Sequence, residues 1–192
     1  MTGRATLFLA VMMGLTPAAA EARSRSVQLA GEATVLAEWR KAENRASCAP
    51  LAFLPDPLTA ARFPRGTVRR AYFGGGWAVA FDLPDERSAY GVAGVGLLPR
   101  DDDAPAQKRR ELARQWPYVR ELAQPGGQGR PGFAGYGMEG AMAYPPGNPQ
   151  GLGANSLAYV TVDGQTCLYN VWSRLGRSHL ELLLDSLRPL KR

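Results

Sequence analysis

Apolar side chains recur along the chain at two spacings, and these spacings predict where helices and strands lie. Residues 31–48 carry apolar side chains on one helical side and charged ones opposite, which predicts a first helix ending before Pro50. Residues 101–116 begin with acidic and continue with basic residues, the order that a helix dipole favours, so a second helix is expected there. Residues 117–123 are expected to add one or two helical turns after a kink at Pro117.

The clearest helix signal lies in residues 176–190. Ser178 and Glu181 have the spacing of a capping box at its start, and Pro189 is expected to stop the helix. Four leucines fall on one stripe, which is the side of the helix that we expect to face the core: Leu180, Leu183, Leu184 and Leu187.

Residues that alternate between larger and smaller side chains predict strands between these helices. One strand is expected over residues 67–81 and a returning strand over residues 88–98, joined by a charged turn that contains a proline. Another is expected over residues 133–144, despite several glycines. The predicted helix over residues 101–116 lies between the second and the third of these strands.

Asp163-Gly164 is a strong signal for a two-residue hairpin turn, because such turns favour residues that tolerate a positive φ. It joins the alternating runs 156–162 and 165–173 and would place Val160 opposite Cys167. Both faces of this hairpin are largely apolar, so we expect other elements to cover both faces of the sheet.

The predicted order of elements is therefore helix, two strands, helix, three strands, helix. This order specifies an α+β domain with an antiparallel sheet of about five strands, sandwiched by N-terminal, middle and C-terminal helices. We expect residues 23–192 to form one domain, since a chain of this length supports a single core. The order, and above all the last hairpin running into a leucine-rich helix, resembles the Mog1/PsbP-like sandwich in outline. That resemblance implies a fold and carries no function across.

Residues 1–22 are typical of a secretory signal peptide. Arg4 gives a positive start, an apolar run over residues 5–17 follows, and small residues flank possible cleavage sites after Ala20 and Ala22. The apolar run is short for a membrane span, which takes roughly 20 residues, and an uncleaved anchor is the alternative. We therefore expect a protein secreted into a bacterial periplasm or beyond, with no integral membrane span after cleavage.

The two cysteines, Cys48 and Cys167, fit that compartment. They lack CxxC spacing, so they predict neither a redox motif nor a four-ligand metal site. In an oxidising compartment we expect them to form one disulfide that ties the first helix to the last hairpin. Two separately buried thiols are the alternative.

The protein has a formal net charge of +6 at pH 7, and nearly all of its basic residues are arginine. Both facts favour anionic binding partners. The planar guanidinium of arginine suits phosphate and carboxylate groups. Nucleic acid is not expected as a partner outside the inner membrane, where the polyanions are lipid phosphates, lipopolysaccharide and cell-wall polymers. Arginines spread along a chain are also typical of an ordinary solvated surface.

Gly74, Gly75 and Gly76 raise the question of a phosphate-binding loop. A Walker loop continues with Lys-Ser or Lys-Thr, whereas Trp77 follows here. A dinucleotide fingerprint has spaced glycines between a strand and a helix, whereas an alternating apolar run follows these. We interpret them as a bulge or tight bend at the rim of the sheet. The sequence predicts no cofactor and no metal site.

Support for an enzyme is weak, because no serine lies in a G-x-S-x-G or S-x-x-K motif. His179, the only histidine, is a candidate base at the start of the last helix. Glu139, a carboxylate within an otherwise apolar strand, is the other weak catalytic candidate. A helix flank and an edge strand account for these two residues without catalysis.

We therefore expect a non-catalytic protein that contacts another component of the cell envelope, which is a protein, a lipid phosphate or a cell-wall polymer. The expected contact loops are Gly74–Gly76, the connector 124–132 with Gln124 and Arg130, and the loop 145–155 with Asn148 and Asn155. The alternative function is that of a small periplasmic hydrolase acting on a cell-wall or lipid component through carboxylates.

Overall fold

The computed structural model describes residues 29–55, 67–99, 101 and 103–191, so the predicted signal peptide, residues 1–22, lies outside the described residues. The helices are α1 (Glu32–Lys41), the 3-10 helix η1 (Glu43–Ala46), α3 (Ala104–Gln115) and α4 (Arg177–Ser186). The strands are β1 (Leu51–Phe53), β2 (Thr67–Arg70), β3 (Trp77–Leu83), β4 (Glu86–Leu97), β5 (Tyr118–Leu122), β6 (Gly132–Met138), β7 (Ser156–Val162), β8 (Cys167–Ser173) and β9 (Leu187–Pro189).

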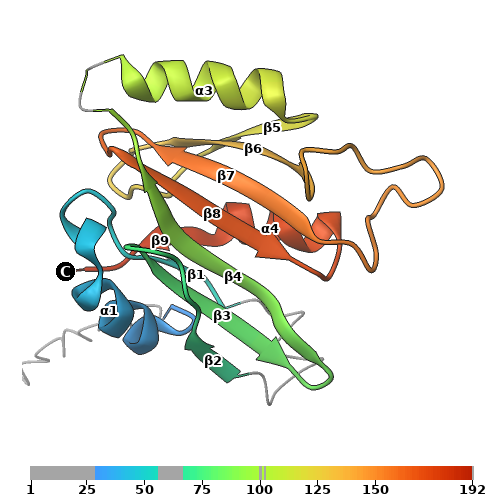
Figure 1. Ribbon diagram of the computed structural model, residues 1–192, viewed down its shortest axis with the longest axis horizontal. Helices are drawn as coiled ribbons and strands as arrows, with labels where there is room; N and C mark the ends of the chain where they lie inside the picture. The colour runs from blue at the N-terminus through green and yellow to red at the C-terminus, as the bar shows by residue number, and fades with distance from the viewer. Residues whose placement is uncertain (1–28, 56–66, 100, 102, 192) are drawn as a thin grey trace, which may run out of the picture.

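Seven of these strands form one antiparallel sheet in the order β2-β3-β4-β8-β7-β6-β5 (Figure 1). The strands β1 and β9 pair antiparallel in a separate sheet of two strands. The predicted α+β class with an antiparallel sheet and three helices is confirmed. The strand count is higher than expected, because short strands such as β1, β5 and β9 lie where helix or loop was predicted.

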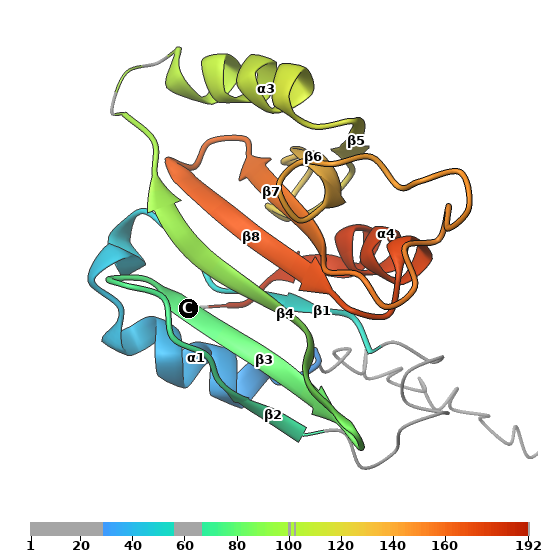
Figure 2. The same cartoon turned by 45° about the vertical axis from the view of Figure 1, so that its right-hand side comes forward.

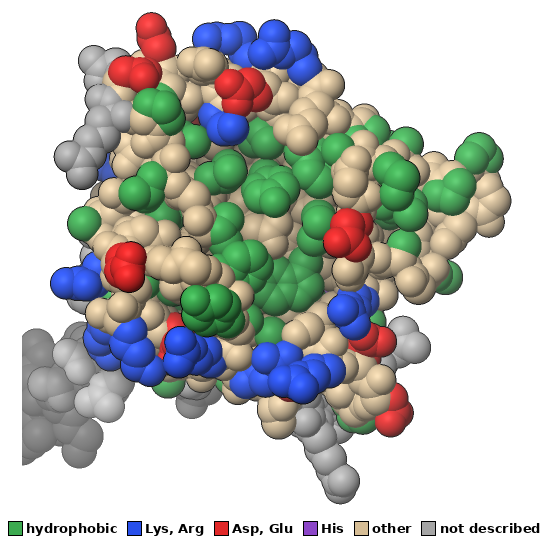
Figure 3. Space-filling model, viewed as in Figure 1, with side chains coloured by type: hydrophobic (Ala, Val, Ile, Leu, Met, Phe, Trp, Pro, Cys, Tyr) green, Lys and Arg blue, Asp and Glu red, His purple; other side chains and the backbone are tan. Residues whose placement is uncertain are grey.

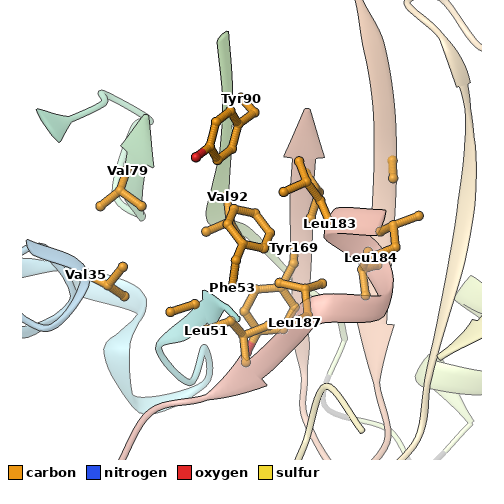
Figure 4. Packing of buried hydrophobic residues seen from close by; sticks show 14 of the residues in the cluster. Val35, Leu51, Phe53, Val79, Tyr90, Val92, Tyr169, Leu183, Leu184 and Leu187 are labelled. Carbon is orange, nitrogen blue, oxygen red and sulfur yellow. The ribbon is translucent and has the colours of Figure 1, made fainter. Parts of the chain in front are cut away.

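One face of the main sheet, termed the core face, carries the hydrophobic core. α1 packs against β3, and α4 packs against β8 and β7, with β1 and β9 between the two helices (Figures 1 and 2). Side chains from all of these layers meet in one cluster, which includes Val35, Leu51, Phe53, Val79, Val92, Tyr169, Leu183 and Leu187 (Figure 4). The four leucines predicted to face the core do so, because each is at most 1% exposed, but only Leu180, Leu183 and Leu184 lie in α4, whereas Leu187 begins β9.

The opposite face of the sheet, termed the open face, is covered only in part. α3 packs over β5, β6 and β7, where a Cβ on Gly135 would lie 2.9 Å from Trp116 and 3.1 Å from Leu112. Glycine at this position therefore lets the helix approach the sheet closely. Among the described helices, none covers β4 and β8 on this side (Figure 1). The expectation that both faces are covered holds for only part of the sheet.

The predicted disulfide between Cys48 and Cys167 is confirmed, with an S–S distance of 2.00 Å and Cα atoms 4.9 Å apart. It joins the segment after η1 to the first residue of β8, across 119 positions of sequence. Both cysteines are fully buried. The indole nitrogen of Trp39 donates a 2.8 Å hydrogen bond to the Cys48 carbonyl, so α1 is fixed to the same point.

The prediction of extra helical turns after α3 was wrong, because residues 118–122 form strand β5. The backbone of Trp116 is already extended, at φ −99° and ψ 138°, and Pro117 has no N–H with which to continue the helical hydrogen bonds. β5 then pairs with β6, with Tyr118 opposite Tyr136. The strand that stabilises this conformation, β6, lies outside the segment from which the extra helical turns were predicted.

The register predicted for the last hairpin was also wrong, because Val160 lies opposite Tyr169 and not opposite Cys167. The β7–β8 connection contains Gln165 and Thr166 as well as Asp163-Gly164, so it is two residues longer than the predicted turn. Gln165 bonds through its side-chain oxygen to the Ala49 N–H (3.4 Å) and to the hydroxyl of Tyr169. These tertiary bonds hold Gln165 outside the β7–β8 ladder.

Two helix boundaries and one strand boundary differ from prediction. The helix expected over 176–190 with Pro189 as its stop ends at Ser186, because Leu187 has an extended backbone (φ −59°, ψ 129°) and pairs with Phe53 as part of β9. The helix expected over 31–48 is interrupted at Ala42, whose extended backbone (φ −72°, ψ 139°) separates α1 from η1. The strand expected over 133–144 ends at Met138, where a tight turn begins. The capping box is absent, since Ser178 donates to Gln150 instead (2.5 Å).

Candidate functional site

The predicted contact loops lie at opposite ends of the sheet. β6 begins at Gly132, next to the connector 124–132, and ends at Met138, before the loop 145–155. Gly74–Gly76 lie with the connector at the end where Cys167 begins β8, termed the disulfide end (Figure 1). The three loops therefore do not form one continuous contact surface.

Gly74–Gly76 form the turn between β2 and β3, so the single strand expected over 67–81 is two antiparallel strands. A Cβ on Gly76 would lie only 2.2 Å from the carbonyl oxygen of Gly94. Gly75 has a φ of 71°, and its carbonyl oxygen accepts hydrogen bonds from the N–H groups of Glu43 (3.1 Å) and Asn44 (3.3 Å). These contacts explain the glycines as a tight bend packed against η1 and β4.

The connector 124–132 is held by turns of its own. The Gly127 N–H donates to Gln124 (3.2 Å), and the Arg130 N–H donates to Gly127 (2.9 Å). The side chains of Gln124 and Arg130 are exposed. Arg130 lies near the β7–β8 turn, because its Nη1 is 3.5 Å from the point where a Cβ added to Gly164 would lie.

The loop 145–155 is fixed at its base and exposed at its tip. The Asn148 side chain donates to the Leu152 carbonyl (3.0 Å) and accepts from the Leu152 N–H (3.1 Å), which closes a turn. The Gln150 carbonyl accepts the N–H of Arg177 at 2.7 Å, so the loop also holds the start of α4. Leu152 is 66% exposed. Asn148 therefore has a structural role in this loop.

Glu139 and Asn155 are brought together at this end of the sheet. The Asn155 amide donates to Glu139 at 3.2 Å and accepts from Arg174 Nε at 3.2 Å, and Arg174 pairs with Glu86 at 2.9 Å. The four side chains line an open pocket of about 300 Å³. All the polar contacts are made within the group, which has an excess of only one negative charge.

His179 contacts a serine, as a hydrolase would require, but in a buried setting. Its Nδ1 lies 2.8 Å from Ser173 Oγ, and its ring packs edge-on against Tyr90 at 5.0 Å. Ser173 is fully buried, and its Oγ accepts the N–H of Leu175 at 3.0 Å. Because the hydroxyl oxygen accepts that N–H and has no exposed surface, it cannot reach a substrate carbonyl. The pair instead fixes the segment between β8 and α4.

A second titratable cluster joins β6 to α4. The Tyr136 hydroxyl donates to Glu181 at 2.6 Å, and Arg177 Nε donates to the same oxygen at 2.8 Å while its guanidinium stacks on Tyr118 at 4.1 Å. Burial, and then the bond to Glu181, raise the pKa of Tyr136 to about 12. Burial acts to raise the pKa of Glu181, but the bonds from Tyr136 and Arg177 lower it overall. These groups satisfy one another's hydrogen bonds and charges, which indicates a structural role for the cluster.

The apolar surface on the open face was predicted from the sequence only in part. Leu157, Tyr159, Leu168 and Trp172 alternate outward on β7 and β8 toward the open face and are only partly buried. Phe73 from the β2–β3 turn packs next to them, 6.1 Å from the Trp172 ring. These five residues are termed the open-face patch. Figure 3 shows hydrophobic side chains gathered in the middle of this face.

The strands β3 and β4 beside the patch carry small residues on the same face. Gly91 lies opposite Trp172, and a Cβ there would be 2.2 Å from the indole ring. The indole nitrogen of Trp172 donates to the Ser88 carbonyl at 3.3 Å, so the ring is held flat over β4. The glycine thus positions a partly exposed tryptophan on the surface.

Basic residues lie along two margins of the open face, above and below the patch in Figure 3. At the upper margin α3 carries Arg110 and Arg114, and at the lower margin Arg87 is the second residue of β4, next to the β3–β4 turn (Figure 1). These three side chains are exposed and have no ion pair with any described residue. Other basic residues at the margins are paired, for example Arg69 with Asp82 at 2.7 Å.

Comparison with protein families, with curated proteins and with solved structures found no match. The likeness to the Mog1/PsbP-like sandwich therefore stays a prediction from the order of elements. Within the described ranges, no helix has both the length and the apolar character needed to cross a membrane. The same ranges contain no group of three or more His, Cys, Asp or Glu side chains placed to hold a metal ion.

Proposed function

We propose that this protein is a secreted, non-catalytic binding protein of the bacterial cell envelope, and that the open-face patch contacts the phosphate-bearing surface of an anionic lipid. The observation that carries the proposal is the patch itself, an apolar and aromatic surface between two basic margins. The five patch residues are partly exposed, and contiguous apolar surface that solvent reaches marks interaction sites in soluble proteins.

The chemistry of the patch favours a lipid over the other envelope components. Tyrosine and tryptophan combine an apolar ring with a polar tip, which suits the boundary between headgroups and acyl chains. The guanidiniums of Arg87, Arg110 and Arg114, which form no ion pair with an acid in the described ranges, complement lipid phosphates. A cell-wall polymer offers anionic groups but little apolar surface to cover Phe73 and Leu168.

Secretion is supported by the disulfide between Cys48 and Cys167, since such bonds persist in oxidising compartments. The predicted signal peptide in residues 1–22 agrees with that compartment. The hydrolase alternative gains no support from His179, because its serine contact is buried.

Vesicle flotation tests the proposal, using vesicles of phosphatidylglycerol mixed with phosphatidylcholine and vesicles of phosphatidylcholine alone. We expect preferential binding to the anionic vesicles, weakened by salt. The double variant Arg110→Glu/Arg114→Glu is expected to bind about tenfold or more weakly, since each basic residue at a membrane surface contributes about 1 kcal/mol. Leu168→Ser is expected to weaken binding through loss of apolar contact.

Two variants serve as matched controls. Arg40→Glu reverses an exposed charge on α1, which packs on the core face, and Leu152→Ser removes an exposed leucine of the loop 145–155. Neither is expected to change vesicle binding as the patch variants do. Equal binding to both kinds of vesicle, or equal effects of patch and control variants, would overturn the proposal.

A further inference from the structure

A second cavity lies at the disulfide end of the sheet, away from the open-face patch. It has a volume of about 460 Å³ and lies between the segment around Cys48, the connector 124–132, the β7–β8 turn and β9. This volume falls within the range of small-molecule sites, roughly 300–1,000 Å³. Ser47 and Thr166 line it and are direct chain neighbours of the two cysteines. The disulfide therefore joins two of the cavity walls.

Gln165 contributes a hydrogen-bond donor to this cavity. Its side-chain Oε1 accepts the N–H of Ala49 at 3.4 Å and also the hydroxyl of Tyr169. A backbone N–H can only donate, so the atom facing Ala49 is the amide oxygen. The NH₂ group of Gln165 has no acceptor among the described residues and remains available to a ligand.

Arg130 gives the cavity its charge. It is the only charged residue in the lining, its side chain is exposed, and it forms no ion pair within the described part of the chain. Asp163, the chain neighbour of Gly164 in the lining, pairs with Arg109 at 3.6 Å and does not line the cavity. The cavity is therefore positive.

We propose that this cavity binds a small molecule through a carboxylate or phosphate group. The oxyanion would accept hydrogen bonds from the Arg130 guanidinium and the Gln165 amide, and the hydroxyls of Ser47 and Thr166 are further donors in the lining. Leu190, together with a proline and two alanines of the lining, offers an apolar wall for the remainder of the ligand. This inference does not depend on the function proposed for the open face.

Backbone NMR of the oxidised protein tests the site with two probes, inorganic phosphate and acetate, each titrated at constant ionic strength. We expect saturable shifts of the amide signals of Gly126, Gly164 and Thr166, which lie in two separate segments of the lining. The anion that binds more tightly identifies the ligand group as phosphate or carboxylate.

Two variants test the donors. Arg130→Gln is expected to weaken binding by about tenfold or more, because it removes a charge-assisted contact. Gln165→Glu keeps the oxygen that accepts from Ala49 and Tyr169 but replaces the NH₂ donor with a carboxylate oxygen, so it is expected to abolish binding while the protein stays folded. Arg40→Gln, an exposed arginine outside the lining, is the control and is expected to bind as the wild type does.

The result that overturns the proposal is a linear, non-saturating response to both anions. Saturable binding of equal affinity in the wild type and in Arg130→Gln would overturn it as well. Circular dichroism and the thermal midpoint of each variant establish that a loss of binding is not a loss of folding.

Discussion

The hydroxyl of Tyr136 in β6 donates a 2.6 Å hydrogen bond to the carboxylate of Glu181 in α4, 45 positions further along the chain. This bond fixes the last helix to the sheet beneath the loop 145–155. It also makes folding stability depend on the ionisation of a buried phenol, because Tyr136 is only 5% exposed.

The stability of the protein is expected to fall between pH 10 and pH 12. The pKa of Tyr136 is about 12 in the folded protein, against an ordinary value of 10.0. Stabilisation by the protonated phenol is therefore fully present below pH 10 and is lost as the pH rises through the folded pKa. The expected contribution is about 2–3 kcal/mol to the free energy of unfolding, measured by urea denaturation.

The matched variant is Tyr136→Phe, in which this part of the pH dependence is expected to disappear. In Glu181→Gln, ultraviolet titration is expected to show a lower Tyr136 pKa than in the wild type, since the carboxylate charge is gone. Identical pH profiles for the wild type and Tyr136→Phe would show that the phenol makes no such contribution.

Gly76→Ala is expected to lower the free energy of unfolding by about 1–3 kcal/mol, because its Cβ would meet the Gly94 carbonyl oxygen and backbone must move. Gly74→Ala in the same turn is the control, since a Cβ there has no atom within 4 Å. Its stability is expected to stay the same or rise by up to about 1 kcal/mol. Chemical denaturation of both variants measures the difference, and similar values would contradict the packing explanation of the bend.

Removal of the disulfide in the double variant Cys48→Ala/Cys167→Ala is expected to destabilise the fold by about 4–5 kcal/mol, from the entropy of the long loop that it closes. The urea midpoint measures this change. Wild-type protein treated with a reductant should move toward the variant, whereas the variant should not respond to the reductant. An unchanged midpoint after complete reduction would contradict the expected contribution.

Ser173→Ala is expected to cost about 1–3 kcal/mol of stability, because it leaves the Leu175 N–H and a His179 nitrogen without this partner. Ser178→Ala, an exposed serine in the same region, is expected to change stability by less than about 0.5 kcal/mol. Turnover of wall fragments and esters by the wild type, abolished in both His179→Ala and Glu139→Gln, would favour the hydrolase alternative instead.

Local sequence patterns were sufficient to predict those elements whose conformation depends mainly on their own residues. The leucines of α4 and the acid-to-base order of α3 predicted both helices, and the compartment argument predicted the pairing of Cys48 with Cys167. β5 was missed because its extended conformation depends on pairing with β6. The hairpin register was missed because Gln165 bonds to Ala49, which is 116 positions away in sequence.

The open-face patch could be predicted only in part. Strand alternation placed Leu157, Tyr159, Leu168 and Trp172 on one face, but no local signal showed that this face would lack a covering helix. That outcome depends on the packing of α1 and α4 against the other face, which leaves only α3 for this one. The lining of the disulfide-end cavity likewise comes from segments far apart in the chain, including Ser47, Arg130 and Gln165.

The pairing of β1 with β9 has a consequence for the order in which the protein can fold. Leu51 lies opposite Pro189, so a strand near the start of the described chain has its partner among the last residues. A chain that emerges from a ribosome with its N-terminal end first cannot pair β1 until the β9 segment has emerged. Such long-range pairing slows folding. Completion of the core therefore depends on a pairing that spans most of the described chain.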